Sequence, residues 1–218
     1  MHRVNRSDGE VTKQKILHTA AELIAQHGFA KTTSKAIAQA AEVDLASINY
    51  HFKGRDGLYQ AVLVEAHQQY LDEQYLIELT ASALPAEDKL HDFFKTLTEK
   101  LFSDNSCYSQ VLMREMLTSS AQLSQFMEHS GTRKFLLLRQ IISDAAGLSI
   151  DHPQLLPCVL SVMAPCFMLI FAGSNASSPL HRVAHMDAEA LAMHLKVFSL
   201  AGLKAVREQI SAQPKDAL

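Results

Sequence analysis

Side chains that can donate hydrogen bonds or carry a positive charge gather between residues 33 and 55. One group offers hydroxyl, ammonium and guanidinium donors of the kind that bind phosphate oxygens: Thr33, Ser34, Tyr50, Lys53 and Arg55. A second group fills a stretch without an acidic residue: Leu45, Ala46, Ser47, Asn49, Tyr50 and His51. A helix with such side chains fits the DNA major groove, where Asn49 can form a bidentate contact with adenine. These residues predict a DNA-binding interface.

Three helices are needed to present these side chains, and the apolar pattern predicts them. An apolar stripe with a spacing near 3.6 residues indicates a helix over about residues 10–27, which Gly28 ends. Thr32 or Thr33 can cap a helix over 34–41, and Asp44 can cap a third helix through His51. The positions expected to pack these elements together are Ile37, Ala38, Ala41, Val43, Ile48, Phe52 and Leu58. Two short helices around a tight turn form a helix-turn-helix pattern.

The remaining sequence has a helical periodicity as well. A long helix opens at Arg55 or Asp56, and further helices are expected over 70–84, 87–102, 106–118, 122–146, 152–173 and 187–210. A loop is expected over 174–185, and a bend or break near Pro157 or Pro165. We therefore predict an all-α fold with a three-helix DNA-binding domain over residues 1–56 and a larger helical domain over 57–218.

Composition restricts the class of protein. The chain has 218 residues, 48% of them hydrophobic, with 8 Gly, 6 Pro and no Trp, which fits neither a disordered chain nor an all-β fold. Three Cys without a CxxC pair argue against a disulfide framework or a Cys-based zinc site and favour a reducing compartment. Residues 1–60 carry 8 Lys and Arg against 6 Asp and Glu, and the remainder 12 against 17, so the N-terminal part is mildly basic.

Other kinds of chemistry find little support in the sequence. No GxSxG, P-loop, GxGxxG or HExxH motif occurs, so we expect no enzyme, no cofactor and no metal. His181 and His185 have the i, i+4 spacing of a helical metal site but fall in the expected loop. The uncharged stretch 155–173 approaches the length of a membrane span, although its prolines favour a buried interface helix. A helical interaction module that does not bind DNA is the rival interpretation.

A characteristic series of residues runs from 28 to 59: Gly28, Thr32-Thr33, Ile37-Ala38, Ala41-Glu42-Val43, Asn49-Tyr50-His51-Phe52, Arg55 and Leu58-Tyr59. This series resembles the DNA-binding domain of the TetR/AcrR family of transcriptional regulators and covers about the first quarter of the chain. Three positions depart from the family pattern: Glu42 stands for a turn Gly, Asn49 for a frequent aromatic residue and Arg55 for Lys. A turn Gly commonly needs a positive φ, so we expect strain at Glu42.

The resemblance implies a cytoplasmic, one-component regulator: a homodimeric repressor that a small molecule releases from DNA. The last two helices, about 154–173 and 187–210, would form the dimer interface. Two recognition helices would then meet successive major grooves of a palindromic double-stranded operator. The central helices, roughly 61–180, would enclose a pocket for an effector that is at least partly apolar. Residues suited to line it are Phe94, Met113, Met116, Phe126, Met163 and Phe167.

Several residues allow two interpretations. Lys35 contacts a base or phosphate, or is simply solvated, and His51 lies near DNA or is a buried or capping histidine. Arg114 and Glu115 interrupt an apolar run, and they either pair with neighbouring residues or orient a polar group of a ligand. Two further alternatives concern Arg3 and Arg6, as a minor-groove arm or a solvated tail, and Cys158 and Cys166, as core packing or a redox sensor.

Overall fold

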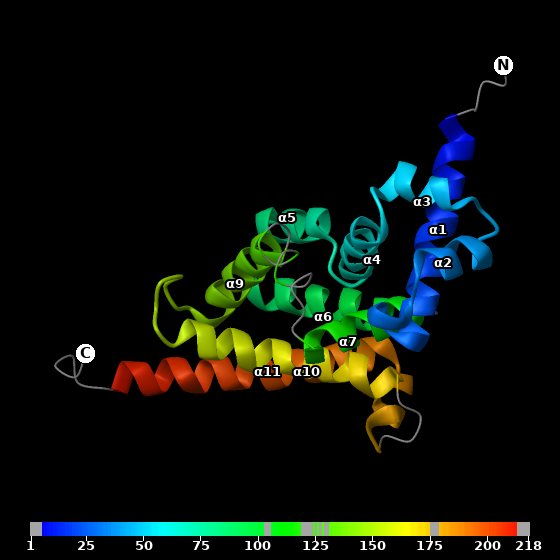
Figure 1. Ribbon diagram of the computed structural model, residues 1–218. Helices are drawn as coiled ribbons and strands as arrows, with labels where there is room; N and C mark the ends of the chain where they lie inside the picture. The colour runs from blue at the N-terminus through cyan, green and yellow to red at the C-terminus, as the bar shows by residue number, and fades with distance from the viewer. Residues whose placement is uncertain are drawn as a thin grey trace. The chain divides into compact units, whose positions relative to one another are not determined.

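The computed structural model describes residues 6–102, 106–118, 124, 126, 128, 131–174 and 179–212. This part of the chain contains helices and turns but no strand, which confirms the predicted all-α fold (Figure 1). In chain order the elements, with η for a 3-10 helix, are α1 (Arg6–His27), η1 (Phe29–Lys31), α2 (Ser34–Ala40), α3 (Leu45–Phe52), α4 (Arg55–Tyr70), α5 (Glu73–Ala81), α6 (Ala86–Phe102), α7 (Ser106–Thr118), α9 (Thr132–Ala146), α10 (Leu155–Ser174), η3 (Pro179–His185) and α11 (Ala188–Ala212).

The chain divides into two compact units. The first comprises residues 1–69 and 105–130, and the second residues 70–104 and 131–218. The first unit therefore contains α1 to α4 together with α7, and the second contains α5, α6, α9, α10, η3 and α11. The predicted boundary between functional domains, after residue 56, falls in the first turn of α4 and stays a prediction.

In the first unit, α1 packs against α2 and α7. Ile16, Ala20 and Ile24, each four residues apart, are buried along one side of α1. The positions predicted to pack the helix-turn-helix are all buried or half-buried: Ile37, Ala38, Ala41, Val43, Ile48, Phe52 and Leu58. Burying a large apolar side chain contributes about 1.5–3 kcal/mol, so this packing fixes α2 against α1 and α3 against α2.

In the second unit, α6 packs along α11 and against α9 and α10. The largest buried side chains of this core are Leu76, Leu90, Phe93, Phe94, Ile141, Ile142 and Leu155. Polar contacts add to the packing of α11 on α6. The Thr98 Oγ1 atom lies 3.1 Å from the Ala188 carbonyl oxygen, and Lys196 Nζ lies 3.0 Å from Asp88 Oδ1.

Two predictions about individual elements are wrong in part, those over 70–84 and 174–185, and two others are tested only in part. The helix predicted over 70–84 is only α5, because Asp72 caps it by accepting the Tyr75 N–H at 2.7 Å. The helix predicted over 122–146 is assigned from Thr132, and most of residues 119–130 lie outside the described residues. The loop predicted over 174–185 is wrong for Pro179–His185, which form η3. No break occurs at Pro165, which lies inside the continuous helix α10.

Helix α10 contains the uncharged stretch 155–173, whose length approaches that of a membrane span. Over the residues that the structure describes, no helix combines the length and apolar character that a membrane span requires.

Candidate nucleic-acid interface

The turn between α2 and α3 is closed by two backbone hydrogen bonds. The Val43 N–H donates to the Ala38 carbonyl at 2.9 Å, and the Glu42 N–H donates to the Gln39 carbonyl at 3.2 Å. This pairing is a Schellman motif, which requires a left-handed residue after the helix. Glu42 occupies that position with φ 53°, which confirms the predicted positive φ. Its Oε2 atom lies 3.1 Å from Lys15 Nζ, so an exposed ion pair links the turn to α1.

The two short helices begin differently. Thr33 precedes α2, and its Oγ1 accepts the Ala36 N–H at 3.1 Å, which confirms it as a cap. Because this oxygen acts as the acceptor, the hydroxyl hydrogen is able to donate to another group. Asp44 precedes α3, but its side chain makes no capping hydrogen bond, so the predicted side-chain cap is wrong there.

Helix α3 has one packed side and one solvent side. Ile48 and Phe52, four residues apart, are buried. The opposite side exposes Leu45, Ala46, Asn49 and Tyr50, and these four residues form the α3 face. Tyr50 has 84% of its area in solvent, and Leu45 has 49%. Ser47 and His51 are half-buried beside this face, and the His51 ring meets the Tyr50 ring edge-on at 4.9 Å.

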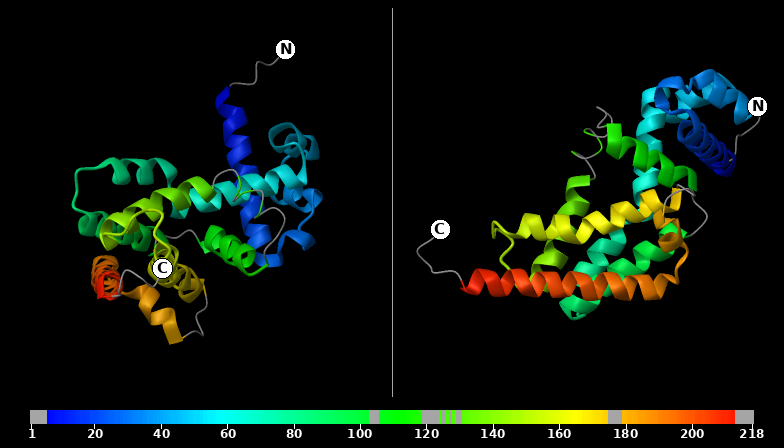
Figure 2. Two further views of the ribbon diagram at one scale, coloured as in Figure 1. Left: turned by 90° about the vertical axis from the view of Figure 1, so that its left-hand side faces the viewer. Right: turned by 90° about the horizontal axis from the view of Figure 1, so that it is seen from below.

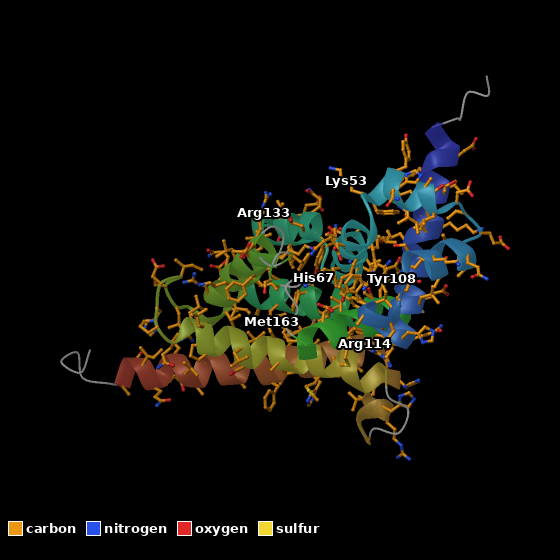
Figure 3. The ribbon with its side chains drawn as sticks, viewed as in Figure 1. Lys53, His67, Tyr108, Arg114, Arg133 and Met163 are labelled. Atoms are coloured by element: carbon orange, nitrogen blue, oxygen red, sulfur yellow. The ribbon has the colours of Figure 1, made fainter. Side chains whose placement is uncertain are left out.

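A tight turn joins α3 to α4. Lys53 ends α3 with φ 59°, and its N–H donates to the Asn49 carbonyl at 3.0 Å. Gly54 follows with φ 108°, a conformation that favours glycine. At Gly57 a Cβ atom would lie 1.9 Å from the Phe52 carbonyl oxygen, so only glycine allows this close approach of α4 to the end of α3. The Lys53 side chain is left exposed at the turn (Figure 3).

Arg55, the first residue of α4, is held by Phe29. Its Nη2 donates to the Phe29 carbonyl at 2.8 Å, and its Cζ lies 4.1 Å from the centre of the Phe29 ring. The Tyr59 ring stacks on the same ring, with 4.0 Å between centroids and 6° between planes. The Tyr59 hydroxyl donates to the Glu115 carboxylate of α7, and both side chains are buried. Burial and this carboxylate raise the pKa of Tyr59, so its hydroxyl stays protonated as the donor.

Helix α7 also holds the end of α1. Arg114 Nη2 lies 3.4 Å from the Gln26 carbonyl oxygen, and Arg114 Nη1 lies 3.0 Å from the place that a Cβ on Gly28 would take. Figure 3 labels Arg114 and Tyr108, both on α7, where this helix packs on α1. Of the two interpretations of Arg114 and Glu115, these contacts favour pairing with residues of the same unit.

The predicted DNA-contacting residues come from α2, α3 and the turn into α4. Seven are exposed: Thr33, Lys35, Leu45, Ala46, Asn49, Tyr50 and Lys53. Four are half-buried: Ser34, Ser47, His51 and Arg55. Arg55 differs from the rest because its guanidinium already contacts Phe29. Arg3 and the side chain of Arg6 lie outside the described residues.

The residues that hold the interface helices in place were not predicted from the sequence. Phe29, Gly57 and Tyr59 were given no positioning role, and the role of Glu115 was left between two interpretations. The available signals were a single acid within the apolar run 111–117 and a second glycine three residues after Gly54. Neither signal identifies a partner: Tyr59 is 56 residues from Glu115, and a helical pattern does not show that the Phe52 carbonyl lies so close to Gly57.

The residues proposed for an effector pocket are divided between the units. Phe126 is buried in the first unit, with its ring 4.5 Å from that of His67, and Met113 is half-buried there. In the second unit Phe94 is fully buried, Met163 is half-buried and Phe167 is 43% exposed. The side chain of Met116 lies outside the described residues. Their role in binding an effector stays a prediction.

A second uncovered surface lies on α10 and α11, which run side by side (Figure 2). It exposes large apolar side chains, and these form the α10–α11 face: Leu156, Leu160, Phe167, Met168, Met193, Val197 and Phe198. Between the two helices is a groove of about 160 Å³, lined by Gln154, Pro157, Cys158, Ser161, Val162, Phe198, Ser199, Gly202, Leu203 and Val206. None of the six predicted effector residues lines this groove.

The cysteine and histidine alternatives can also be compared with the structure. Cys158 and Cys166 are buried in the core of the second unit, and burial raises the pKa of the Cys166 thiol to about 12. This favours packing over redox sensing. The His181 and His185 rings lie 4.2 Å apart, but within the described residues no group of three or more His, Cys, Asp or Glu is arranged to hold a metal ion.

A helical protein whose N-terminal helix-turn-helix exposes the α3 face has the architecture of a DNA-binding regulator. The profile of bacterial regulatory proteins of the TetR family matches residues 16–62. The profile of the C-terminal domain of the HTH-type transcriptional dual regulator CecR matches residues 86–203, more than half of the chain. The chain belongs to the TetR family of bacterial regulatory proteins, whose members are DNA-binding regulators and not enzymes.

Individual relatives agree with this family. The probable acrEF/envCD operon repressor of Escherichia coli K12 is 34% identical over 101 residues, which cover 46% of this chain and 42% of that protein. The probable regulator YttP of Bacillus subtilis is 27% identical over 132 residues, 61% of this chain and 56% of that protein. The chain thus spans about half the length of these relatives.

Solved structures show the same fold. The fatty acid degradation regulator FadR of Bacillus halodurans has a TM-score of 0.68 at 17% identity, covering 88% of this chain and 96% of that one. A complex of SmeT with triclosan has a TM-score of 0.63 at 18% identity, covering 88% of this chain and 91% of that one.

Proposed function

We propose that this protein is a one-component repressor that binds a palindromic operator as a homodimer and leaves it when a small molecule binds. The observation that supports the proposal most directly is the exposed α3 face, with Lys53 at its end. In a major groove, Asn49 would meet base edges while Thr33, Tyr50 and Lys53 contact phosphates. Arg55 would position the turn between α3 and α4 through its contacts with Phe29, and its predicted phosphate contact is secondary.

The proposed dimer uses the α10–α11 face. Helix α10 has no Asp, Glu, Lys or Arg between Leu155 and Ser174, and its exposed Leu160 is 68% accessible. An apolar face of this extent on one chain marks a contact surface. A second copy is the simplest partner, since a twofold axis pairs an apolar surface with itself. At Gly202 a Cβ would meet nothing within 4 Å, so the groove leaves room for a side chain of the second copy.

The proposed effector is at least partly apolar. The residues we propose to contact it are Phe94, Met113, Met116, Phe126 and Met163. Phe167, which the sequence also suggested for this role, belongs to the α10–α11 face. A solved complex of SmeT contains triclosan. Such a molecule would release DNA by binding more tightly to the arrangement that does not fit the operator.

Repression is proposed over activation because a matched relative is a probable operon repressor. The C-terminal profile is named for a dual regulator, so the direction of control needs its own measurement. A reporter gene placed behind the operator is expected to rise in expression when the regulator gene is deleted.

The first experiment selects bound sequences from a random DNA pool and titrates the selected sequence against salt. We expect a palindrome whose half-sites lie about one helical turn or more apart, and a linear fall of log affinity with log salt. A lack of enrichment, both for the purified protein and for protein refolded without ligand, would overturn the proposal and favour a helical interaction module.

A further inference from the structure

The chemistry of the α3 face restricts the base pairs that it can read. Helix α3, with the sequence LASINYHF, contains no Arg, Lys, Gln, Asp or Glu. Guanine is most often read by Arg or Lys through its O6 and N7 atoms, and cytosine through a carboxylate that accepts from N4. The side chains that most often read G·C pairs are therefore missing from this helix, while Asn49 remains for adenine and the Ser47 hydroxyl can bond to either kind of pair.

An apolar residue begins the same face. Leu45 is 49% exposed, whereas Leu17 of α1 and Leu58 of α4 in the same unit are 5% and 1% exposed. Ala46, the residue after Leu45, is exposed as well. The major groove offers one apolar group, the C5 methyl of thymine. Against a G·C pair, the Leu45 side chain would instead remove water from polar base edges without replacing their hydrogen bonds.

The spacing of these residues places their contacts together. Leu45 and Asn49 are four residues apart and so share one line along α3, about 6 Å long. This length is close to two base-pair steps of about 3.4 Å. We propose that the operator half-site is rich in A·T pairs, with a thymine methyl packed on Leu45 and Ala46 and an adenine paired with Asn49 within two steps of it. This inference depends on the proposed DNA-binding function.

The test replaces single thymines of the selected half-site with deoxyuridine, which removes the methyl group and keeps the base pairing. At the contacted position we expect wild-type affinity to fall about fourfold per half-site, the loss that corresponds to one methyl group. The Leu45→Ala variant is expected to lose most of this discrimination between thymine and uracil operators, because only Ala46 would still contact the methyl group. Val64→Ala, which shortens an exposed residue of α4, is the matched control and should keep the wild-type discrimination.

The outcomes separate the two proposals. If no DNA sequence is selected, both the function and the inference fail. If a palindrome is selected but its half-sites are G·C-rich, or if no uracil position changes the affinity, the inference alone fails. The inference alone also fails if Leu45→Ala discriminates between thymine and uracil operators as the wild type does. Asn49→Ala is expected to lose its preference at one A·T position only, and an equal loss on every operator variant would remove Asn49 from base reading.

Discussion

The α3 face and the α10–α11 face are both uncovered surfaces, but they differ in chemistry. The first combines Leu45 and Ala46 with an amide and a phenol, and it ends at the exposed cation Lys53. The second is dominated by Leu, Phe, Met and Val side chains, with His194 stacked on Phe198, and its helix α10 carries no charged residue. Exposure alone therefore does not identify a partner. Mixed side chains with a cation suit a wet, charged groove, whereas a continuous apolar surface suits a dry contact between protein chains.

The largest expected effect comes from placing a charge in the α10–α11 face. Phe198→Asp would bury a carboxylate twice in each dimer, once per copy. We expect the dimer dissociation constant to rise by about a thousandfold or more, as measured by sedimentation at several concentrations. Leu136→Asp, at an exposed apolar position of α9, is the control and should leave the dimer intact. A Phe198→Asp protein that stays dimeric at low concentration would show that this face is not the interface.

The next largest effect is expected at Gly57 of α4, and Gly202 of α11 serves as the comparison. Gly57→Ala should lower the free energy of unfolding by about 2–4 kcal/mol, because the new Cβ would collide with the Phe52 carbonyl. In the Phe198→Asp background, which is expected to be monomeric, Gly202→Ala should be neutral or should raise it by up to about 1 kcal/mol, since its Cβ meets open space within a helix. Chemical denaturation measures both. Equal effects of the two substitutions would mean that α4 does not approach α3 so closely.

Tyr50→Ala is expected to weaken DNA binding by about tenfold, because it removes a hydroxyl and a ring that are both proposed to contact the groove wall. The loss should be similar on all operator variants, since phosphate contacts carry no sequence information. Fluorescence anisotropy with labelled operators measures it, and Tyr50→Phe separates the hydroxyl from the ring. A loss confined to one base position would instead make Tyr50 a base-reading residue.

The smallest effect is expected at the strained turn. Glu42→Gly should raise the melting temperature slightly, because relief of the left-handed strain, about 1 kcal/mol, exceeds the loss of the exposed pair with Lys15. Helix α9 ends in the same motif with Gly147 at φ 63°, which shows the residue that this geometry favours. Lys15→Ala measures the ion pair separately. An unchanged or lower melting temperature for Glu42→Gly would show that the strain is smaller than the ion pair.

The local features of the helix-turn-helix could be predicted from the sequence. Apolar spacing identified Ile37, Ile48 and Phe52 as buried, and the same spacing left the α3 face in solvent. The cap at Thr33 and the positive φ at Glu42 followed from rules that involve only neighbouring residues. These predictions held because each depends on a few consecutive positions.

The contacts that hold the interface helices in place could not be predicted in the same way. Arg55 and Phe29 are 26 residues apart, and Tyr59 and Glu115 are 56 residues apart. No periodic pattern pairs residues over such distances. Gly57 is needed because the Phe52 carbonyl, at the end of α3, comes within contact distance, which a helical pattern does not reveal. The 3-10 helix over Pro179–His185 was missed because the apolar residues of this segment do not recur with a helical period.

The exposure of Tyr50 also has an optical consequence. The chain has no Trp, so its near-ultraviolet emission comes from five tyrosines. Tyr59, Tyr70 and Tyr108 are buried and Tyr75 is half-buried, which leaves Tyr50 as the tyrosine that a dissolved quencher can reach most freely. The protein thus contains its own fluorescent reporter at the C-terminal end of the α3 face, and unlabelled DNA that covers this face would shield it from the quencher.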